Sequence, residues 1–384
     1  MAQLLLPTAD KSTELYTIDA GLMPVSGGAW NRTAYAATHI VADPLAAIDP
    51  WIDCAVDWDT TLKFRQHLWD LGFGVAEAMD TAQRGMGMDW PTSLELIRRS
   101  TALAKSGGHL IASGAGTDHL DVNPDLTIDD VIAAYELQCE AVEATGSRVI
   151  LMASRALCAV AKTPDDYAKV YERILGGLQQ PAILHWLGEM FDPALRGYWG
   201  SKDHSVAMDT CLEIIKANTS RIDGIKVSLL SAEKEISMRN RLPDGVLMYT
   251  GDDFNYPDLI KGDGERHSHA LLGIFDPIAG VAAMALDALA DTDAAKYDTV
   301  FTPTVPLSRH IFGTPTRFYK TGVVFLAYLN GHQDHFTMVG GQESARSTLH
   351  LAQIVRLAND AKLFTDPERT AERAQAVFAT RGLS

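Results

Sequence analysis

Cysteine and positive charge are both scarce in this sequence. It has only four cysteines, Cys54, Cys139, Cys158 and Cys211, with no Cys-x-x-Cys pair, so neither a zinc module nor a disulfide framework is predicted. Lysine and arginine number 33 against 49 aspartate and glutamate residues, for a formal net charge of −16. Because this charge repels phosphate backbones and anionic lipids, we expect no nucleic-acid partner and no membrane partner.

Long hydrophobic runs are also missing. No segment approaches the roughly 20 consecutive apolar residues of a membrane-spanning helix. The apolar run at residues 4–7 is followed by charges and is too short for a signal-peptide core. We therefore expect a cytoplasmic protein. Its 384 residues are nonetheless 47% hydrophobic, which suffices for a large core and excludes disorder of the whole chain.

Short runs rich in β-branched residues alternate with longer stretches of helical spacing. Eight strand-like runs begin at Ala34, Phe73, His109, Arg148, Pro181, Ile222, Gly245 and His269. Eight strand–helix units over about 260 residues are typical of a (β/α)8 TIM barrel in the α/β class. We expect an N-terminal hairpin or extension at 1–33, the barrel at 34–292 and a C-terminal helical extension at 293–384. An open doubly wound sheet is the alternative, but the glycine-rich phosphate loop it requires is missing.

One lysine stands inside the apolar sixth run, 222–228. Strand alternation places Ile225 and Val227 on one face and Lys226 on the other. If the apolar face packs under the helices, Lys226 points into the barrel, where lost hydration favours the neutral, nucleophilic amine. The alternative is a lysine that reaches solvent or pairs with Asp223.

Four motifs support the catalytic interpretation of Lys226. They are GIK at 224–226, GDD at 251–253, HALLGIFDP at 269–277 and PTRFYKTG at 315–322. In order and spacing, from about residue 108 to 341, the chain resembles the dihydrodipicolinate synthase and N-acetylneuraminate lyase superfamily. More particularly, it is similar to a divergent, largely uncharacterised bacterial branch that is dihydrodipicolinate synthase-like.

The resemblance implies a barrel with a helical extension, homo-oligomers (dimers or tetramers) and class I lyase chemistry. The covalent Schiff base would form through Lys226 on a small-molecule carbonyl substrate, with no cofactor. Two family motifs differ here. The Tyr-Asn-x-Pro that usually ends the fifth strand is replaced by a string containing His185, and the Gly-Thr-Thr-Gly-Glu loop is replaced by DTAQRG at 80–85. The pyruvate-type site is therefore not reproduced.

His185 is the predicted proton shuttle, because an imidazole exchanges protons near neutrality; the alternative is a core histidine bonded to backbone carbonyls. The predicted substrate-binding residues are Thr81, Arg84, Ser154, Arg155 and Asp252. Arg155 could instead pair with Asp165 or Asp166, and Asp252 could instead cap the following helix. The aromatic insertion at 188–205 is expected to cover the barrel mouth as a lid or to pack against another subunit.

We therefore expect a carbon–carbon or carbon–oxygen lyase, an aldolase or dehydratase acting on a sugar-derived oxo acid or keto sugar. Two alternatives remain open. One is a divalent-metal-dependent barrel aldolase or isomerase, with ligands drawn from His185, Glu189, Asp80, Asp118 and His119. The other is a barrel that binds an oxo acid or sugar without catalysis.

Overall fold

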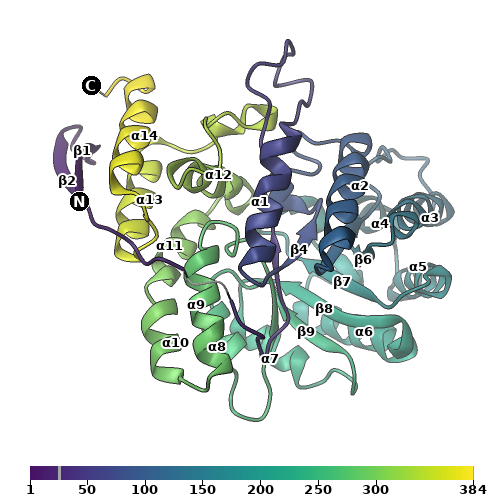
Figure 1. Cartoon of the computed structure of the whole chain (residues 1–384). Coiled ribbons are helices and arrows are strands. Elements are labelled where there is room, and N and C mark those ends of the chain that lie inside the picture. Colours follow the sequence, from purple (N-terminus) through teal and green to yellow (C-terminus); the bar gives the residue numbers. More distant parts are fainter. Residues whose placement is uncertain (25–26, 384) are drawn as a thin grey trace.

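The computed structural model describes residues 1–24 and 27–383. At its centre, eight parallel strands close into a barrel in the order β10-β3-β4-β5-β6-β7-β8-β9 (Figure 1), which confirms the predicted TIM barrel. The barrel strands are β3 (Ala34–Ala37), β4 (Gly74–Glu77), β5 (Ile111–Ala115), β6 (Arg148–Leu151), β7 (Ala182–Leu187), β8 (Ile222–Ser228), β9 (Leu247–Thr250) and β10 (His269–Leu272).

Helices follow the strands and cover the barrel. They are α1 (Trp58–Asp70), α2 (Trp90–Gly107), α3 (Ile128–Thr145), α4 (Arg155–Val160), α5 (Pro164–Gly177), α6 (His204–Ala217), α7 (Ala232–Arg239), α8 (Tyr256–Lys261) and α9 (Ala279–Ala290). Local sequence sets several of their ends. Thr163 and Asp166 form a capping box that starts α5, with Pro164 at its first position, as the hydroxyl–proline–acid order predicts.

The C-terminal region is helical, as expected, but its divisions differ from the prediction. It contains α10 (Ala294–Phe301), α11 (Thr304–Ile311), α12 (Lys320–Leu329), α13 (Thr348–Asp360) and α14 (Pro367–Thr380). The spacing of apolar residues predicts helices over 316–329, 344–363 and 367–380 in this region, so α10 and α11 are additional. The helix predicted over 344–363 begins only at Thr348, because Ser347 caps it by accepting a hydrogen bond from the backbone of His350.

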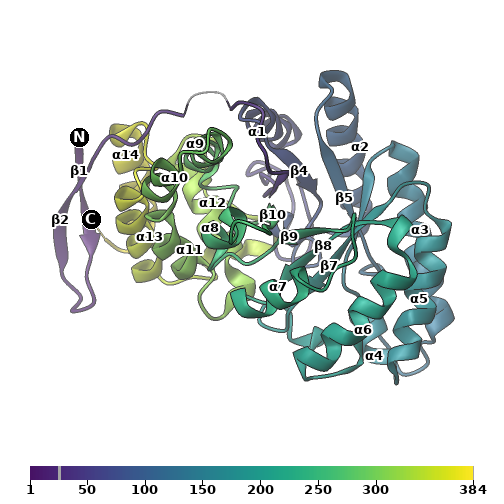
Figure 2. The same cartoon turned by 90° about the horizontal axis from the view of Figure 1, so that it is seen from below.

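The expected N-terminal hairpin consists of β1 (Ala2–Pro7) and β2 (Thr13–Ile18). It lies against α14 and α13, far from the barrel strands (Figure 2). Leu6 and Ile18 are fully buried, so apolar contacts hold the hairpin against the helical region.

The strands separate two environments. Ile225 and Val227 of β8 belong to the apolar cluster between strands and helices. Tyr35, Ile183 and Tyr249 belong to a smaller cluster inside the barrel. The alternation of β8 is therefore as predicted, and the opposite face, which carries Lys226, faces the barrel interior.

One buried ion pair joins α1 to β4. Arg65 donates from Nε and Nη2 to the two carboxylate oxygens of Glu77, each at 2.9 Å, and its Nη1 donates to the carbonyl oxygens of Thr61 and His39. Both side chains are fully buried. Because every charge finds a partner, this pair fixes the helix on the strand that leads into the Asp80 loop.

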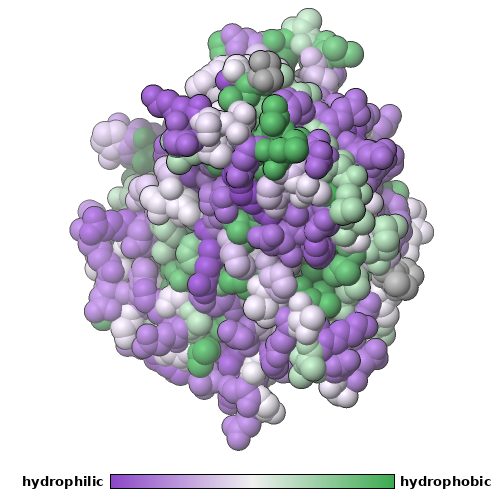
Figure 3. Space-filling view, turned by 90° about the vertical axis from the view of Figure 1, so that its left-hand side faces the viewer, coloured by the Kyte–Doolittle hydropathy of each residue, from purple (hydrophilic) through white to green (hydrophobic). Residues whose placement is uncertain are grey.

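The surface is mostly polar, but one loop is not. Figure 3 shows hydrophobic atoms at the top of the molecule, where Figure 1 draws the loop between β3 and α1. Leu45, Trp51 and Ile52 in this loop are 91%, 77% and 81% exposed. Among the residues in the structure, no helix is both long and apolar enough to cross a bilayer. The expected dimer or tetramer stays a prediction.

Replacing Arg65 by methionine tests the buried pair. Arg65→Met leaves Glu77 buried without its counter-charge, so the free energy of unfolding should fall by about 3–5 kcal/mol. Arg98→Met, on the exposed face of α2, is the matched control and should change it by less than about 0.5 kcal/mol. Urea unfolding measures both. Equal effects of the two substitutions would show that the Arg65–Glu77 pair does not anchor α1.

Candidate active site

A cavity of about 290 Å³ lies where four successive strands end. Its walls come from the segments that follow β4, β5, β6 and β7. They include Asp80, Arg84, Gly85, Thr117, Asp118, Ser154, Arg155, His185, Asp192 and Leu195. TIM barrels place substrate sites at this end of the strands, so the cavity is the candidate active site.

Lys226 lies on β8 between His185 of β7 and Tyr249 of β9, its register partners. It is 5% exposed. Asp223, its alternative partner, instead binds Arg148 and the Tyr249 hydroxyl. Within the described chain, the Lys226 ammonium has no ion-pair partner inside 4.0 Å. The alternative, in which Lys226 reaches solvent or pairs with Asp223, is therefore wrong.

Burial lowers the pKa of Lys226 below that of free lysine, although the negative charges of Asp80 and Asp253 oppose the shift. Burial also raises the pKa of Asp80, but the positive charges of Lys226 and Lys320 outweigh it, so this pKa lies below its usual value. Burial raises the pKa of Asp253 to about 8. Near neutrality, Lys226 therefore faces one ionised carboxylate, Asp80, and one mostly protonated carboxyl, Asp253.

Gly251, which follows β9, makes room for the Lys226 side chain. A Cβ at position 251 would lie 2.8 Å from Cε of Lys226 and 2.3 Å from Oγ of Ser228. Both distances are shorter than carbon–carbon and carbon–oxygen contacts allow. The glycine of the GDD motif thus has a steric role: it leaves the space through which the lysine extends.

His185 also points into the barrel interior. It is 2% exposed and lines the cavity, and its Nε2 shares a 3.2 Å hydrogen bond with Oγ of Ser228. Burial and the positive charge of Lys226 lower the pKa of His185 well below its usual value. The imidazole is therefore neutral at pH 7, and it can exchange a proton only by way of its hydroxyl partner or a bound substrate.

Asp80 and Thr81 contact a residue far away in the sequence. The hydroxyl of Tyr319, which directly precedes α12, donates to Oδ2 of Asp80 at 2.9 Å and lies 2.7 Å from Oγ1 of Thr81. Oδ1 of Asp80 is buried with no hydrogen-bond partner in the part of the chain described. The C-terminal helical region thus reaches the reaction cavity through Tyr319, and Thr81, a predicted substrate-binding residue, is already bonded to it.

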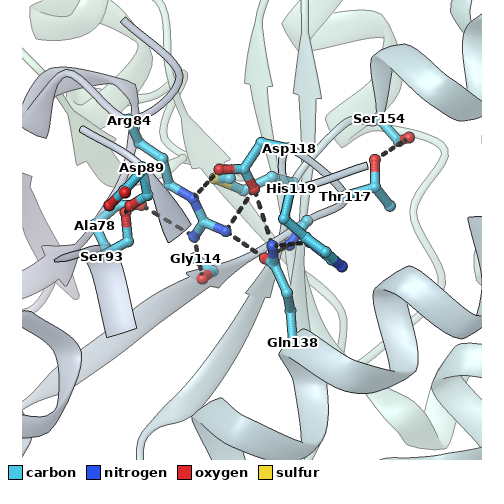
Figure 4. A network of polar contacts seen from close by, with 12 residues as sticks. Ala78, Arg84, Asp89, Ser93, Gly114, Thr117, Asp118, His119, Gln138 and Ser154 are labelled. Atoms are coloured by element: carbon cyan, nitrogen blue, oxygen red, sulfur yellow. Dashed lines mark hydrogen bonds and ion pairs between the residues drawn. The ribbon is translucent and has the colours of Figure 1, made fainter. Parts of the chain in front are cut away.

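Arg84 is held by protein groups on every side (Figure 4). Its Nε and Nη2 donate to the carboxylate of Asp118 at 3.1 and 2.7 Å, and its Nη1 donates to the Gly114 carbonyl at 2.6 Å. Nη2 also bonds Gln138. Because its donors are occupied, Arg84 shapes the cavity wall and has little capacity left for a substrate.

Ser154 and Arg155 both line the cavity, but they differ in how many of their polar atoms already have hydrogen-bond partners. The Ser154 hydroxyl caps α4 and bonds Thr117 at 2.6 Å. Arg155 pairs through Nε with Asp192, and not with the acids of α5. Its two terminal nitrogens have no partner among residues 1–24 and 27–383. Arg155 is therefore the predicted binding residue with the most free hydrogen-bond donors.

Asp252, another predicted substrate-binding residue, is not among the residues that line the cavity. Its carboxylate accepts from the backbone of Phe254 at 2.8 Å and from both the backbone and side chain of Asn255. Asp252 thus organises the turn before α8, close to the capping role that was its alternative. The residue of the GDD motif whose charge acts on Lys226 is the next one, Asp253.

The insertion at 188–205 forms part of the cavity wall. Asp192 and Leu195 line the cavity, and Phe191 packs edge-on against Phe312 and Tyr319. Trp199 is fully buried in this chain. The insertion therefore covers the barrel mouth from one side.

The five candidate metal ligands do not converge. Asp118 binds Arg84, and Glu189 pairs with His204 at 3.1 Å, away from Asp80. Over the stretch of chain that the structure covers, no three His, Cys, Asp or Glu side chains are grouped to hold a metal ion. The metal-dependent alternative thus has no ligand set in this arrangement.

The family model "Protein of unknown function (DUF993)" matches residues 4–383, nearly the whole chain. The chain belongs to the DUF993 family. A search of curated protein sequences finds no match to this DUF993 protein.

Solved structures show the fold of dihydrodipicolinate synthases. The enzyme from Acinetobacter baumannii, solved in complex with pyruvate, has a TM-score of 0.64 at 14% identity and covers 87% of this chain and 99% of its own. A putative dihydrodipicolinate synthetase from Pseudomonas aeruginosa has a TM-score of 0.63 at 14% identity, over 86% and 99%. A synthase from Bacillus anthracis has a TM-score of 0.59 at 15% identity, over 87% and 99%. The DUF993 chain therefore has the fold that its motifs predicted.

Sequence reasoning missed Tyr319 and Lys320 as site residues. Both belong to PTRFYKTG, the motif at 315–322 that contributed to the resemblance. The motif marked the segment but not its contacts, because a loop-to-helix junction 239 residues from Asp80 carries no local signal of that partner. Asp253 was recognised only as a polar residue after a strand.

The role of Gly251 in this DUF993 protein can be tested with alanine. Gly251→Ala should lower the free energy of unfolding by about 1–3 kcal/mol, because the new methyl overlaps Lys226 and Ser228. It should also slow the reaction of Lys226 with an amine-specific reagent, followed by peptide mass spectrometry. Gly176→Ala in α5, where nothing lies within 4 Å of a new Cβ, is the control and should be neutral or slightly stabilising. Unchanged stability and labelling in Gly251→Ala would refute the steric role.

Proposed function

We propose that this protein is a class I lyase in which Lys226 forms a Schiff base with a carbonyl substrate, as an aldolase or a dehydratase on an oxo acid or keto sugar. The observation that carries the proposal is a single buried lysine on the inner face of β8, with a lowered pKa and no ion-pair partner among the described residues. Such an amine is partly neutral at lower pH than free lysine, as nucleophilic catalysis requires.

The chemistry can be followed in atoms and electrons. The neutral amine of Lys226 adds to the carbonyl carbon. The carbonyl oxygen leaves as water, with one proton from the amine and one from an acid, and the second amine proton stays on the nitrogen of the iminium. Asp253, whose pKa of about 8 keeps it mostly protonated near neutrality, is suited to supply that proton. The iminium then accepts the electron pair of the carbon–carbon bond that breaks, or of the carbon–hydrogen bond that opens a dehydration.

Asp80 is placed to compensate the charge that develops. The iminium keeps a positive charge at the position of the original ammonium, and the ionised carboxylate of Asp80 is the negative group that acts on it. The unpartnered Oδ1 of Asp80 leaves one oxygen free to accept a substrate proton. His185, neutral and bonded to Ser228, can pass a proton between substrate and hydroxyl. Arg155, on the cavity wall, orients polar groups of the substrate.

Similarity to dihydrodipicolinate synthases supports the barrel fold on which the proposal depends. It does not identify the substrate, because the sequence identities are only 12–15%. The departures at residues 80–85 and at His185 favour a carbonyl substrate other than those that the Thr-Thr loop and the phenol usually serve. A metal-dependent reaction and simple binding remain the outcomes that the experiments below distinguish.

Borohydride trapping tests the nucleophile. Incubation with carbonyl compounds and borohydride should give one adduct per chain, located by peptide mass spectrometry at Lys226 and absent from Lys226→Met. Lys296→Met, on the exposed face of α10, should trap like the wild type. An adduct elsewhere would overturn the assignment. Turnover that disappears with a chelator and returns with a divalent ion would support the metal-dependent reaction instead.

The pH dependence of trapping tests the charges around Lys226. The trapping rate should rise with pH and level off below the value for free lysine, because burial lowers this pKa. Asp80 raises the pKa of Lys226, so Asp80→Asn should move the midpoint to still lower pH, by about 1 unit. Asp121→Asn, an exposed carboxylate on the cavity wall, is the control. A midpoint that stays or moves upward in Asp80→Asn would show that Asp80 does not act on Lys226.

A further inference from the structure

A second lysine lies beside the candidate active site and has no part in the chemistry described above. Lys320 begins α12 and is 2% exposed. Its Nζ lies 3.2 Å from Sδ of Met86, 3.4 Å from the carbonyl oxygen of Arg317 and 4.8 Å from the ring centre of Tyr319. Within residues 1–24 and 27–383, no carboxylate comes within 4.0 Å of it.

These partners are weak for a buried ammonium. A thioether is a poor hydrogen-bond acceptor, and the carbonyl lies near the limit of a hydrogen bond. Buried lysines are normally paired with an acid or hydrogen-bonded on all sides. Burial lowers the pKa of Lys320 to about 8, opposed by the charge of Asp80. The group is therefore mostly an ammonium at pH 7, with spare capacity to bind an anion.

Lys320 stands directly behind the cavity wall. Met86, which covers the ammonium, follows Gly85 of the cavity lining. Arg155 and Asp192, whose charges also act on Lys320, line the same cavity. Gly85 has a positive φ, and a Cβ there would lie 3.5 Å from Nη1 of Arg155. The thioether that contacts the Lys320 ammonium thus belongs to a flexible side chain directly after a lining glycine.

Lys320 differs from the other cations near the cavity. Arg84 pairs with Asp118, and Arg155 with Asp192. Lys320 feels the negative charge of Asp80 but has no carboxylate within 4.0 Å among the described residues. It is therefore a buried cation without a close counter-charge.

We propose that Lys320, assisted by the free nitrogens of Arg155, binds the single anionic group of the substrate, a carboxylate or a phosphate, and so positions its carbonyl for Lys226. This inference rests on the proposed lyase function and adds the substrate class: carbonyl compounds that carry one anionic group. The incoming anion displaces the thioether of Met86 from the ammonium. Lys320 is a binding residue, and Lys226 remains the nucleophile.

Paired charged and uncharged carbonyl compounds test the inference. Pyruvate against methyl pyruvate examines a carboxylate, and dihydroxyacetone phosphate against dihydroxyacetone examines a phosphate. In Lys320→Met, the concentration that gives half-maximal borohydride trapping at Lys226 should rise about 10- to 100-fold for at least one charged probe, as expected for a lost charged hydrogen bond. It should stay within about twofold for the uncharged partner. The probe that responds identifies the anion.

Two further variants separate binding from structure. Lys320→Arg keeps the charge and should recover most of the affinity for the charged probe. Lys296→Met on exposed α10 should change nothing. Thermal unfolding should show Lys320→Met to be as stable as the wild type, because methionine replaces a poorly paired buried charge by an apolar group of similar length. A rise of equal size for charged and uncharged probes would overturn the proposal, as would an adduct on Lys320 itself.

The anion site can be tested even if Lys226 forms no Schiff base. If no carbonyl compound is trapped at Lys226, titration calorimetry with pyruvate and with inorganic phosphate still measures anion binding. Binding that falls about 10-fold or more in Lys320→Met, but not in Lys226→Met, would retain the anion site and reject the Schiff base. Binding unaffected by Lys320→Met, or none to either anion, would reject the anion site.

Discussion

The burial of the Lys226 ammonium is the constraint on which the other groups at this end of the barrel depend. A buried lysine costs several kcal/mol unless charge or hydrogen bonds compensate it. Here the compensation is indirect: Asp80 supplies negative charge without a close ion pair, and Gly251 supplies the space in which the side chain extends. An amine held in this way has no close ion-pair partner and a lowered pKa, whereas a tight ion pair would favour the protonated form. The same desolvation keeps His185 neutral and Asp253 mostly protonated.

The strands and the C-terminal helices contribute different things to the cavity. The strands carry Lys226 and His185 at fixed register, with side chains set by the alternation of the barrel interior. The segment that leads into α12 carries Tyr319 and Lys320, which reach Asp80 and the cavity wall from outside the barrel. The proposed nucleophile thus lies on a barrel strand, while Tyr319 and Lys320 lie at a helix start, where chain geometry is freer.

The barrel, the helical extension and the inward direction of Lys226 could be predicted from sequence, because periodicity in strands and helices reports directly on burial. Helix boundaries were predicted less accurately: α10 and α11 were missed, and the helix predicted over 344–363 begins only after its Ser347 cap. At the site, His185 was found because it lies near the end of a strand, and Arg155 because it follows one. Arg84 was expected to bind substrate, but it instead donates its hydrogen bonds to Asp118 and Gln138. Such partnerships depend on which long side chains meet across loops, and local patterns do not encode that.

The hydrogen bond between Tyr319 and Asp80 joins positions 239 apart in the chain. During synthesis, all eight strands leave the ribosome before the residues that complete the pocket have been made. The nascent barrel can therefore close around Lys226 while Asp80 still lacks its phenol partner and the second ammonium is absent. The pocket is complete only when the C-terminal helices dock, so a chain that stopped before them would still lack Tyr319 and Lys320 beside Asp80.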